Sequence, residues 1–179
     1  KSYDPIFKVN PPLRTQRDVE ALREGLADGT IDIVATDHAP HPAETKECEW
    51  QEAAFGMLGL ESALSIVNQT MVQTGLLNWE GVADRMSRAP SRIAGYENHG
   101  GKIEVGALAH LTVINPTQTY RVDRDLVASR SRNTPFHGME LSGVMQGTFF
   151  RGIPTYLGGQ LTSIHSNGSN SEAQGGSSR

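Results

Sequence analysis

The chain has 179 residues, of which 37% are hydrophobic and 20% charged, and its formal net charge is −4. This composition is ordinary for a globular protein, and without clustered Lys and Arg it argues against a nucleic-acid partner. No apolar stretch approaches the roughly 20 residues of a membrane-spanning helix, and no secretory signal is visible. Cys48 is the single cysteine. A disulfide framework is thereby excluded, and a reducing, cytoplasmic location is favoured.

The first 36 residues predict a turn, a helix and a strand. Two successive prolines follow Asn10, which rule out helix there and bias Asn10 toward extended backbone. Thr15 and Asp18 have the spacing of a capping box, and Gly29 stands where a C-cap glycine belongs. The helix between them would carry its apolar residues on one face: Val19, Leu22 and Leu26. The apolar run that ends at residue 36 then predicts a buried strand over residues 31–36.

Two further helices are predicted after a polar loop at residues 42–49. Apolar residues recur at spacings of three and four over residues 52–74, which indicates one long amphipathic helix. These residues are Met57, Leu60, Leu64, Val67 and Met71. A shorter helix over residues 79–87 has Asn78 as its candidate N-cap, and Pro90 opens one more turn. The order helix, strand, helix, helix is typical of the last part of a (β/α) barrel.

The character of the sequence changes after Tyr96. Short apolar or alternating runs separated by Gly and Pro predict β-strands over residues 97–157. In residues 158–179, eleven of 22 residues are Gly or Ser, which predicts a disordered tail. His165 lies in that tail and is not expected to bind a ligand. We therefore divide the chain into a barrel portion at residues 1–96, a β-rich domain at residues 97–157 and the tail.

The most informative motif is residues 36–41, which read TDHAPH. A buried strand that delivers polar side chains at its carboxyl end is the arrangement found at the active-site face of a barrel. Asp37 would then be a carboxylate able to hold a metal ion and to transfer a proton. The alternative for Asp37 is an N-cap of the following helix. His38 would point to the other face, because side chains alternate along a strand, and we do not expect it to be a ligand.

Three segments together resemble one known family. Residues 8–14 read KVNPPLR, and residues 54–61 read AFGMLGLE. With residues 36–41, they occur in the order and spacing typical of bacterial dihydroorotases.

Two later segments extend this resemblance, so that it covers roughly residues 1–156. Residues 101–111 read GKIEVGALAHL and are similar to a strand segment shared by amidohydrolases, with His110 in place of the more usual acidic residue. Residues 131–136 read SRNTPF and resemble the family's C-terminal region, with a structural role.

The resemblance implies the fold class. It implies an α/β chain that forms the C-terminal part of a (β/α)8 TIM-type metallo-amidohydrolase barrel, followed by strands of a small β-sandwich domain. The sequence opens at Lys1 in a loop rather than in an element. We therefore expect the back part of an enzyme, a C-terminal fragment.

The resemblance also implies the chemistry of Asp37. It matches the aspartate of the eighth barrel strand, which ligates one of two zinc ions and acts as a proton shuttle. A hydroxide bridging two such ions attacks the cyclic amide carbonyl, and the aspartate returns the proton to the leaving nitrogen. The reaction implied is the reversible opening of dihydroorotate to N-carbamoyl-L-aspartate in pyrimidine biosynthesis.

Four other residues match substrate-binding positions of the family. Asn10 and His41 match residues that hold the substrate carboxylate, which their N–H donors suit. Phe55 and Gly56 match a pair whose backbone meets the pyrimidine ring, with the glycine permitting close approach. Other interpretations stay open: Asn10 could bond its own turn, His41 could be an exposed loop residue, and Phe55 with Gly56 could simply pack near a helix start.

The chain also departs from the family's pattern. The family is expected to carry a His-x-His pair, two further histidines and a bridging acidic or carboxylated lysine ligand, and this sequence has no His-x-His. Because Asp37 by itself cannot hold two zinc ions, we expect the 179-residue chain alone neither to bind zinc tightly nor to turn over dihydroorotate.

Alternative functions and partners remain open at this stage. An allantoinase or a hydantoinase-like enzyme is the nearest rival within the enzyme class. A noncatalytic amidohydrolase homologue that supports a transcarbamoylase is the rival outside it. Homo-oligomerisation or association with aspartate transcarbamoylase is an expectation from the family alone.

Overall fold

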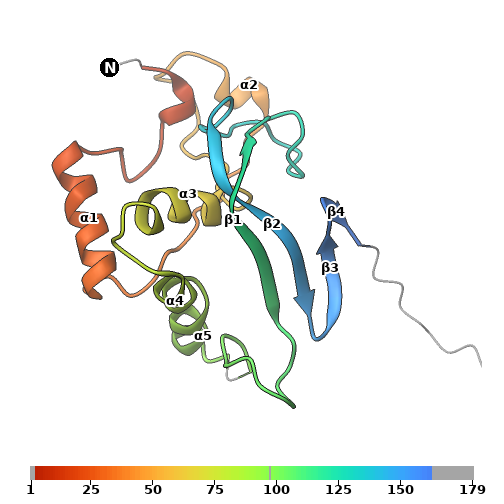
Figure 1. Ribbon diagram of the computed structural model, residues 1–179. Helices are drawn as coiled ribbons and strands as arrows, with labels where there is room; N and C mark the ends of the chain where they lie inside the picture. Colours follow the sequence, from red (N-terminus) through yellow and green to blue (C-terminus); the bar gives the residue numbers. More distant parts are fainter. Residues whose placement is uncertain (1–2, 97, 163–179) are drawn as a thin grey trace, which may run out of the picture.

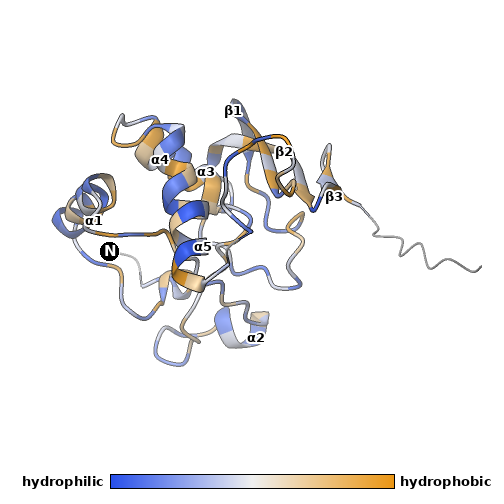
Figure 2. Cartoon of the chain, turned by 90° about the horizontal axis from the view of Figure 1, so that it is seen from below, coloured by the Kyte–Doolittle hydropathy of each residue, from blue (hydrophilic) through white to orange (hydrophobic). Residues whose placement is uncertain are grey.

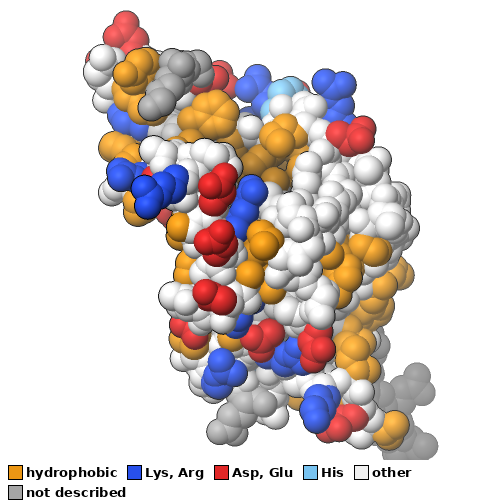
Figure 3. Space-filling model, turned by 60° about the vertical axis from the view of Figure 1, so that its left-hand side comes forward, with side chains coloured by type: hydrophobic (Ala, Val, Ile, Leu, Met, Phe, Trp, Pro, Cys, Tyr) orange, Lys and Arg blue, Asp and Glu red, His pale blue; other side chains and the backbone are white. Residues whose placement is uncertain are grey.

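Helices occupy the first part of the chain and an antiparallel sheet the second. The computed structural model describes residues 3–96 and 98–162. Helix α3 lies between the helices α1, α4 and α5 on one side and the sheet on the other (Figures 1 and 2). Acidic and basic side chains are intermixed over the face shown in Figure 3. Among the described residues, no helix combines the length and the apolar character needed to cross a bilayer.

Helix α1 spans Gln16–Asp28 and confirms the predicted capping. The Thr15 side chain accepts a hydrogen bond from the Asp18 N–H, while the Asp18 carboxylate accepts one from the Thr15 N–H at 2.9 Å. Gly29 ends the helix with a φ of +92°, a conformation that glycine adopts readily. On the predicted apolar face Leu26 is buried, whereas Leu22 remains 58% exposed. Leu26 belongs to a small apolar core with Val67, Met71 and Val82.

The predicted strand at residues 31–36 does not form. Its residues lie outside regular secondary structure, and a single parallel bridge joins His38 to Met57. A strand is stable only when a neighbouring strand satisfies its backbone groups. Here other elements supply the partners, because the Val34 N–H donates to the Arg85 carbonyl at 3.1 Å.

The predicted helix over residues 52–74 begins much later than its hydrophobic spacing indicates. Helix α3 spans Ala63–Val67 and continues into the wider π-helical turn η2, Asn68–Val72. Upstream backbone groups are engaged in tertiary hydrogen bonds instead: the Leu58 N–H donates to the Asn133 carbonyl at 3.0 Å. Met57 and Leu60 therefore match the helical period without lying on a helix. Two short helical segments precede α3, namely η1 at Pro5–Phe7 and α2 at Ala43–Lys46 within the predicted loop.

The predicted helix after residue 78 is present and longer than expected. It consists of α4, Trp79–Ala83, the π-helical turn η3, Asp84–Arg88, and α5, Ala89–Ala94. The Asn78 side chain accepts a hydrogen bond from the Gly81 N–H at 2.9 Å, which confirms the N-cap. The wide turn stands directly before Pro90, whose nitrogen has no proton to donate to the preceding turn.

The sheet has four antiparallel strands in the order β1-β2-β3-β4. They are β1 at Leu111–Arg121, β2 at Glu140–Phe150, β3 at Ile153–Leu157 and β4 at Gln160–Leu161. Ile103 and Val105, which the sequence suggested for a strand, are exposed and lie outside the sheet. The described strands form one layer, whereas a sandwich has two.

Strand β4 contradicts the predicted disorder of the Gly- and Ser-rich segment at residues 160–161. Gln160 and Leu161 pair with β3, so the sheet extends beyond residue 157. The rest of that segment, including His165, lies outside the described residues.

Buried polar side chains join α3 to the sheet. Asn68 is 1% exposed and donates to the Pro116 carbonyl at 3.0 Å and to Ser142 Oγ at 3.2 Å. Ser65 Oγ donates to the Gly143 carbonyl at 2.8 Å, and the Tyr120 hydroxyl donates to Ser65 Oγ. A cavity of about 570 Å³ lies in the same junction. The junction therefore depends on hydrogen bonds as well as on apolar contact.

We expect Asn68→Ala to lower the free energy of unfolding by about 1–3 kcal/mol, because it leaves a buried carbonyl without its donor. Urea unfolding of the chain measures this. Gln118→Ala is the matched control, since that amide is exposed on β1. Equal unfolding midpoints for the two variants would contradict the role of Asn68.

Candidate active-site residues

Three segments that the motifs picked out separately come together in the structure. The Gly56 N–H donates to the Lys8 carbonyl at 2.9 Å, which joins residues 54–61 to residues 8–14. The Ala39 N–H donates to the Met57 carbonyl at 3.0 Å, which joins residues 36–41 to the same segment. The three motifs are therefore one cluster of loops.

Asp37 is exposed at the start of this cluster. Within residues 3–96 and 98–162, no hydrogen bond or ion pair engages its carboxylate. The next helix, α2, begins after Pro42, so Asp37 does not cap it. Its neighbour His38 points its Nδ1 toward the backbone, where it accepts from the N–H groups of Gly59 and Leu60 at 3.2 and 3.3 Å. Asp37 thus offers an unengaged carboxylate, while His38 is already bonded.

His41 is held at both its ring and its backbone. Its Nε2 lies 2.9 Å from the Phe55 carbonyl oxygen, so Nε2 carries the proton and donates it. Its backbone N–H donates to Asn133 Oδ1 at 3.2 Å. His41 is half-buried rather than a free loop residue.

Gly56 permits the close approach of the two loops. Its φ is +135°, and an added Cβ would lie 2.5 Å from the Ala39 Cβ and 3.0 Å from His41 Nε2. Phe55, just before it, is 56% exposed, and Lys8 Nζ lies 4.7 Å from the centre of its ring. The glycine is therefore needed for the contact that places His41.

Asn10 lies next to the cluster through its backbone. It is exposed, and it follows by two residues the Lys8 carbonyl that accepts from Gly56. The structure brings His41, Phe55 and Gly56 into direct contact, whereas Asn10 and Asp37 adjoin them along the chain.

Asn133 is a residue of this cluster whose contacts the sequence did not reveal. It is 4% exposed, and its Nδ2 donates to the Ala39 carbonyl at 2.9 Å and to the Gly56 carbonyl at 3.4 Å. The only sequence signal was the resemblance of residues 131–136, for which a structural role was expected.

Lys46 is a second such residue. It is 2% exposed, and its Nζ donates to the carbonyls of Lys8 and Ala54, each at 3.0 Å. Burial lowers the pKa of its ammonium group, and the positive charge of Lys8 lowers it further, while Asp4 acts in the opposite direction. A buried lysine that tethers two loops gives no signal in a polar sequence segment.

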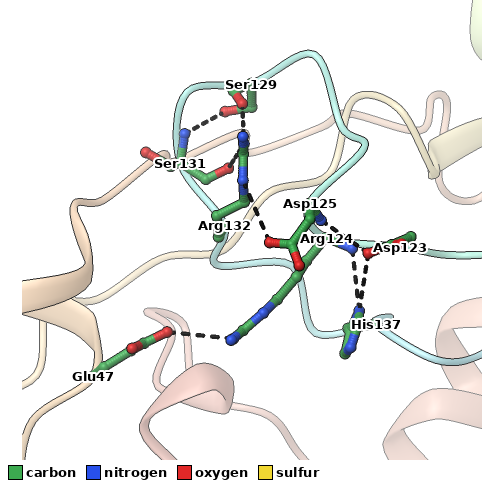
Figure 4. A network of polar contacts seen from close by, with 8 residues as sticks. All are labelled: Glu47, Asp123, Arg124, Asp125, Ser129, Ser131, Arg132 and His137. Carbon is green, nitrogen blue, oxygen red and sulfur yellow. Dashed lines mark hydrogen bonds and ion pairs between the residues drawn. The ribbon is translucent and has the colours of Figure 1, made fainter.

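A polar network holds the segment that carries Asn133 (Figure 4). Arg124 contacts Glu47 at 3.3 Å, and Arg132 donates to the carbonyls of Ser129 and Ser131. His137 Nδ1 accepts a hydrogen bond from the backbone N–H of Arg124 at 3.1 Å. Its 4.0 Å contact with the Asp123 carboxylate is therefore not an ion pair. The network links the connection between β1 and β2 to the loop after residue 41.

The described residues do not complete a metal centre. Across residues 3–96 and 98–162, no three His, Cys, Asp or Glu side chains are placed to hold a metal ion together. A zinc site needs three or four protein ligands, and this part of the chain does not bring such a set together.

A model of the amidohydrolase family matches residues 9–154, and the chain therefore belongs to that family. It is similar to the dihydroorotase of Streptomyces coelicolor, with 59% identity over 162 residues that cover 90% of this chain and 38% of that protein. The dihydroorotase of Mycobacterium leprae is 52% identical over 157 residues, covering 88% and 36%. The predicted resemblance to bacterial dihydroorotases is confirmed. The chain spans a little over a third of the length of these relatives.

Solved structures show the same part of the fold. The L-hydantoinase (dihydropyrimidinase) from Arthrobacter aurescens matches with a TM-score of 0.83 and 32% identity, over 90% of this chain and 36% of that one. The D-hydantoinase (dihydropyrimidinase) from Thermus sp. matches with a TM-score of 0.79 and 25% identity, over 88% and 35%. The chain therefore adopts part of the amidohydrolase fold as an α/β piece with a small antiparallel sheet.

We expect Gly56→Ala to destabilise the chain more than Gly75→Ala, because only the first adds a steric clash. Both glycines have positive φ: at Gly75 (+77°) a side chain costs about 1–2 kcal/mol in backbone conformation, and at Gly56 (+135°), outside the left-handed helical region, it costs at least as much. A Cβ on Gly75 meets no atom within 4 Å, whereas one on Gly56 meets Ala39 at 2.5 Å. Urea unfolding measures the loss in free energy of unfolding for each variant. Equal losses would contradict the expected clash, because they would show that the two loops move apart at no cost in free energy.

We expect Lys46 to make unfolding free energy rise with pH. Its folded pKa lies below the ordinary 10.5, so between these two values the unfolded chain binds more protons, and stability increases as pH rises through that window. Lys46→Met removes this rise in unfolding free energy with pH, whereas Lys102→Met, at an exposed position, keeps the rise. Urea midpoints measured from neutral pH up to 10.5 test the difference. Parallel curves for wild type and Lys46→Met would refute it.

Proposed function

We propose that this chain is part of a dihydroorotase, which opens the ring of dihydroorotate and closes it again from N-carbamoyl-L-aspartate. The observation that carries the proposal is the loop cluster. It joins His41, Phe55 and Gly56 by direct contacts, and Asp37 and Asn10 adjoin these residues along the chain. The 59% identity to a dihydroorotase over 90% of the chain supports the same substrate.

Asn10 and His41 bind the substrate carboxylate in this proposal. Both side chains present N–H donors, and hydrogen bonds to an ionised group are worth about twice as much as neutral ones. The His41 Nε2–H that the Phe55 carbonyl accepts is the proton that a carboxylate would share or take over. Gly56, without a side chain, leaves the backbone open to the flat ring.

Asp37 transfers the proton. Its unengaged carboxylate can accept a proton from the attacking water and return it to the ring nitrogen when the amide bond breaks. Zinc, as a pair of ions, is the cofactor that the family resemblance implies, and a bound zinc ion makes hydroxide available near neutral pH. The described residues supply one ligand and do not complete such a site, so we assign no step to the metal.

The finer features of the whole protein follow the same proposal. Residues 1–96 would be the closing part of a (β/α)8 barrel and residues 97–157 would add strands to a small composite β-sandwich. The solved hydantoinases with which the chain aligns support this arrangement. The lone Cys48 favours a cytoplasmic enzyme, and self-association or a transcarbamoylase partner rests on the family alone.

A hydantoinase is the second candidate, because the solved structures that match this chain carry that name. Asn10 before two prolines and His41 at the end of the hexapeptide favour dihydroorotase, since hydantoinase-like and allantoinase relatives usually carry other residues there. The identity values point the same way, with 59% to a dihydroorotase and 32% to the L-hydantoinase.

A chimera tests the proposal directly. This chain replaces the aligned 162 residues of the Streptomyces coelicolor dihydroorotase, which keeps its remaining sequence. We expect metal-dependent turnover of dihydroorotate. Asp37→Asn should lower kcat at least about 100-fold, the range of general acid–base catalysis. Asn10→Ala should raise KM roughly tenfold through a lost bond to a charged group. Asp32→Asn, an exposed carboxylate on the same segment, is the control.

Two results would contradict the proposal. Turnover of hydantoin or allantoin without dihydroorotate would assign the chain to the rival enzymes. A folded, zinc-loaded chimera without any turnover would favour the noncatalytic homologue.

A further inference from the structure

The loop cluster is tied together by a residue far along the chain. Asn133 stands 92 residues after His41, in the connection between β1 and β2. Its side chain is buried, at 4% exposed, and points at the backbone of both candidate loops. One side-chain amide therefore contacts the two segments that carry the carboxylate- and ring-binding residues.

The hydrogen-bonding capacity of this amide is largely used. Its Nδ2 donates to the Ala39 carbonyl at 2.9 Å and, more weakly, to the Gly56 carbonyl at 3.4 Å. Its Oδ1 accepts from the His41 N–H at 3.2 Å. Its backbone carbonyl accepts from the Leu58 N–H at 3.0 Å. Such a set of bonds fixes the relative position of the two loops and not merely the place of one side chain.

The consequence for His41 is geometric. The ring donates its Nε2–H to the Phe55 carbonyl, directly before Gly56. That bond requires the His41 backbone and the Phe55 backbone to keep their spacing, and Asn133 bonds to His41 and to Gly56. Asn133 does not reach the proposed substrate itself, so any effect on binding passes through His41.

The segment that carries Asn133 is itself anchored. Arg124 reaches back to Glu47 at 3.3 Å, and Arg132 binds the backbone carbonyls of its own loop (Figure 4). The exposed Arg124–Glu47 ion pair contributes little stability, so the position of this loop depends mainly on the hydrogen bonds of Arg132 and Asn133. The connection between two sheet strands thus serves as a support for the candidate site.

We propose that Asn133 is a positioning residue for recognition of the substrate carboxylate. It holds His41 and the Phe55–Gly56 backbone in the spacing that orients the His41 Nε2–H toward the Phe55 carbonyl, where a substrate carboxylate would share it. This inference rests on the proposed function for the identity of the ligand. The positioning of His41 itself does not depend on it.

Nuclear magnetic resonance of the full chain tests the positioning without any assay of activity. In Asn133→Ala we expect the His41 amide proton to exchange about tenfold faster, because it loses its acceptor. Long-range proton–nitrogen spectra of the His41 ring should show loss of the single Nε2–H tautomer. Asn133→Asp keeps an acceptor for His41 but sets an oxygen against the Ala39 carbonyl. It should preserve the slow exchange better than Asn133→Ala while still disturbing the loops.

Thr134→Val is the matched control. Thr134 is buried in the same segment, and its Oγ1 accepts from the nearby Phe136 N–H at 3.3 Å. The substitution disturbs the segment without removing a contact to His41. A merely structural role for Asn133 predicts that both variants change His41 alike, whereas a positioning role predicts a change in Asn133→Ala alone.

Kinetics in the chimera described above provide the second readout. Asn133→Ala should raise KM for dihydroorotate about tenfold and lower kcat much less, the pattern of lost ground-state binding. Thr134→Val should leave both close to the parent values. Loss of kcat without a change in KM would overturn the proposal, as would an unchanged His41 spectrum in Asn133→Ala.

The failure of this inference is distinguishable from failure of the proposed function. If the parent chimera does not turn over dihydroorotate, the proposed function fails, and the His41 spectra still decide whether Asn133 positions that residue. If the parent is active and Asn133→Ala alters the spectra but not KM, Asn133 positions His41, but the claim that this positioning serves recognition of the substrate carboxylate fails, while the proposed function stands.

Discussion

In the part of the chain that the structure describes, the segment before and through the TDHAPH motif meets its neighbours through one parallel bridge, from His38 to Met57, and otherwise through bonds to loops and helices. The positions of the candidate residues depend on these contacts. Backbone N–H and C=O groups in a folded chain must find partners. Here they find them in other loops and helices: Val34 bonds Arg85, Ala39 bonds Met57, and Asn133 bonds both Ala39 and His41. The positions of the candidate residues in the described chain therefore depend on tertiary hydrogen bonds together with that single bridge.

The same principle joins the two parts of the chain. The apolar core is small and lies among the helices, whereas the contact between α3 and the sheet contains buried polar side chains. Asn68 and Ser65 satisfy strand carbonyls across that junction. These directional hydrogen bonds fix the position of the helix on the sheet. Apolar contact alone would allow the helix to slide along the sheet.

The candidate site inherits its chemistry from this arrangement. Asp37 keeps an unengaged carboxylate because the loops bond to each other through backbone groups and through His38, His41 and Asn133. Lys46 packs behind these loops, and its burial there lowers the pKa of its ammonium group. The spacing of the loop cluster is maintained from several directions, and the sheet connection provides one of them through Asn133.

The sequence by itself determined the local features and the family. The capping box of α1 and the Asn78 cap depend on residues close in the chain. The short apolar runs predicted strands over residues 97–157, where β1 to β3 lie, and the spacing of three motifs was enough to indicate the dihydroorotase-like family. Tertiary structure alone decided that residues 31–36 form no strand, that α3 starts at Ala63, and that Asn133 and Lys46 support the site. Each of these depends on partners tens of residues away, and a local pattern carries no information about a hydrogen bond that closes only when distant segments meet.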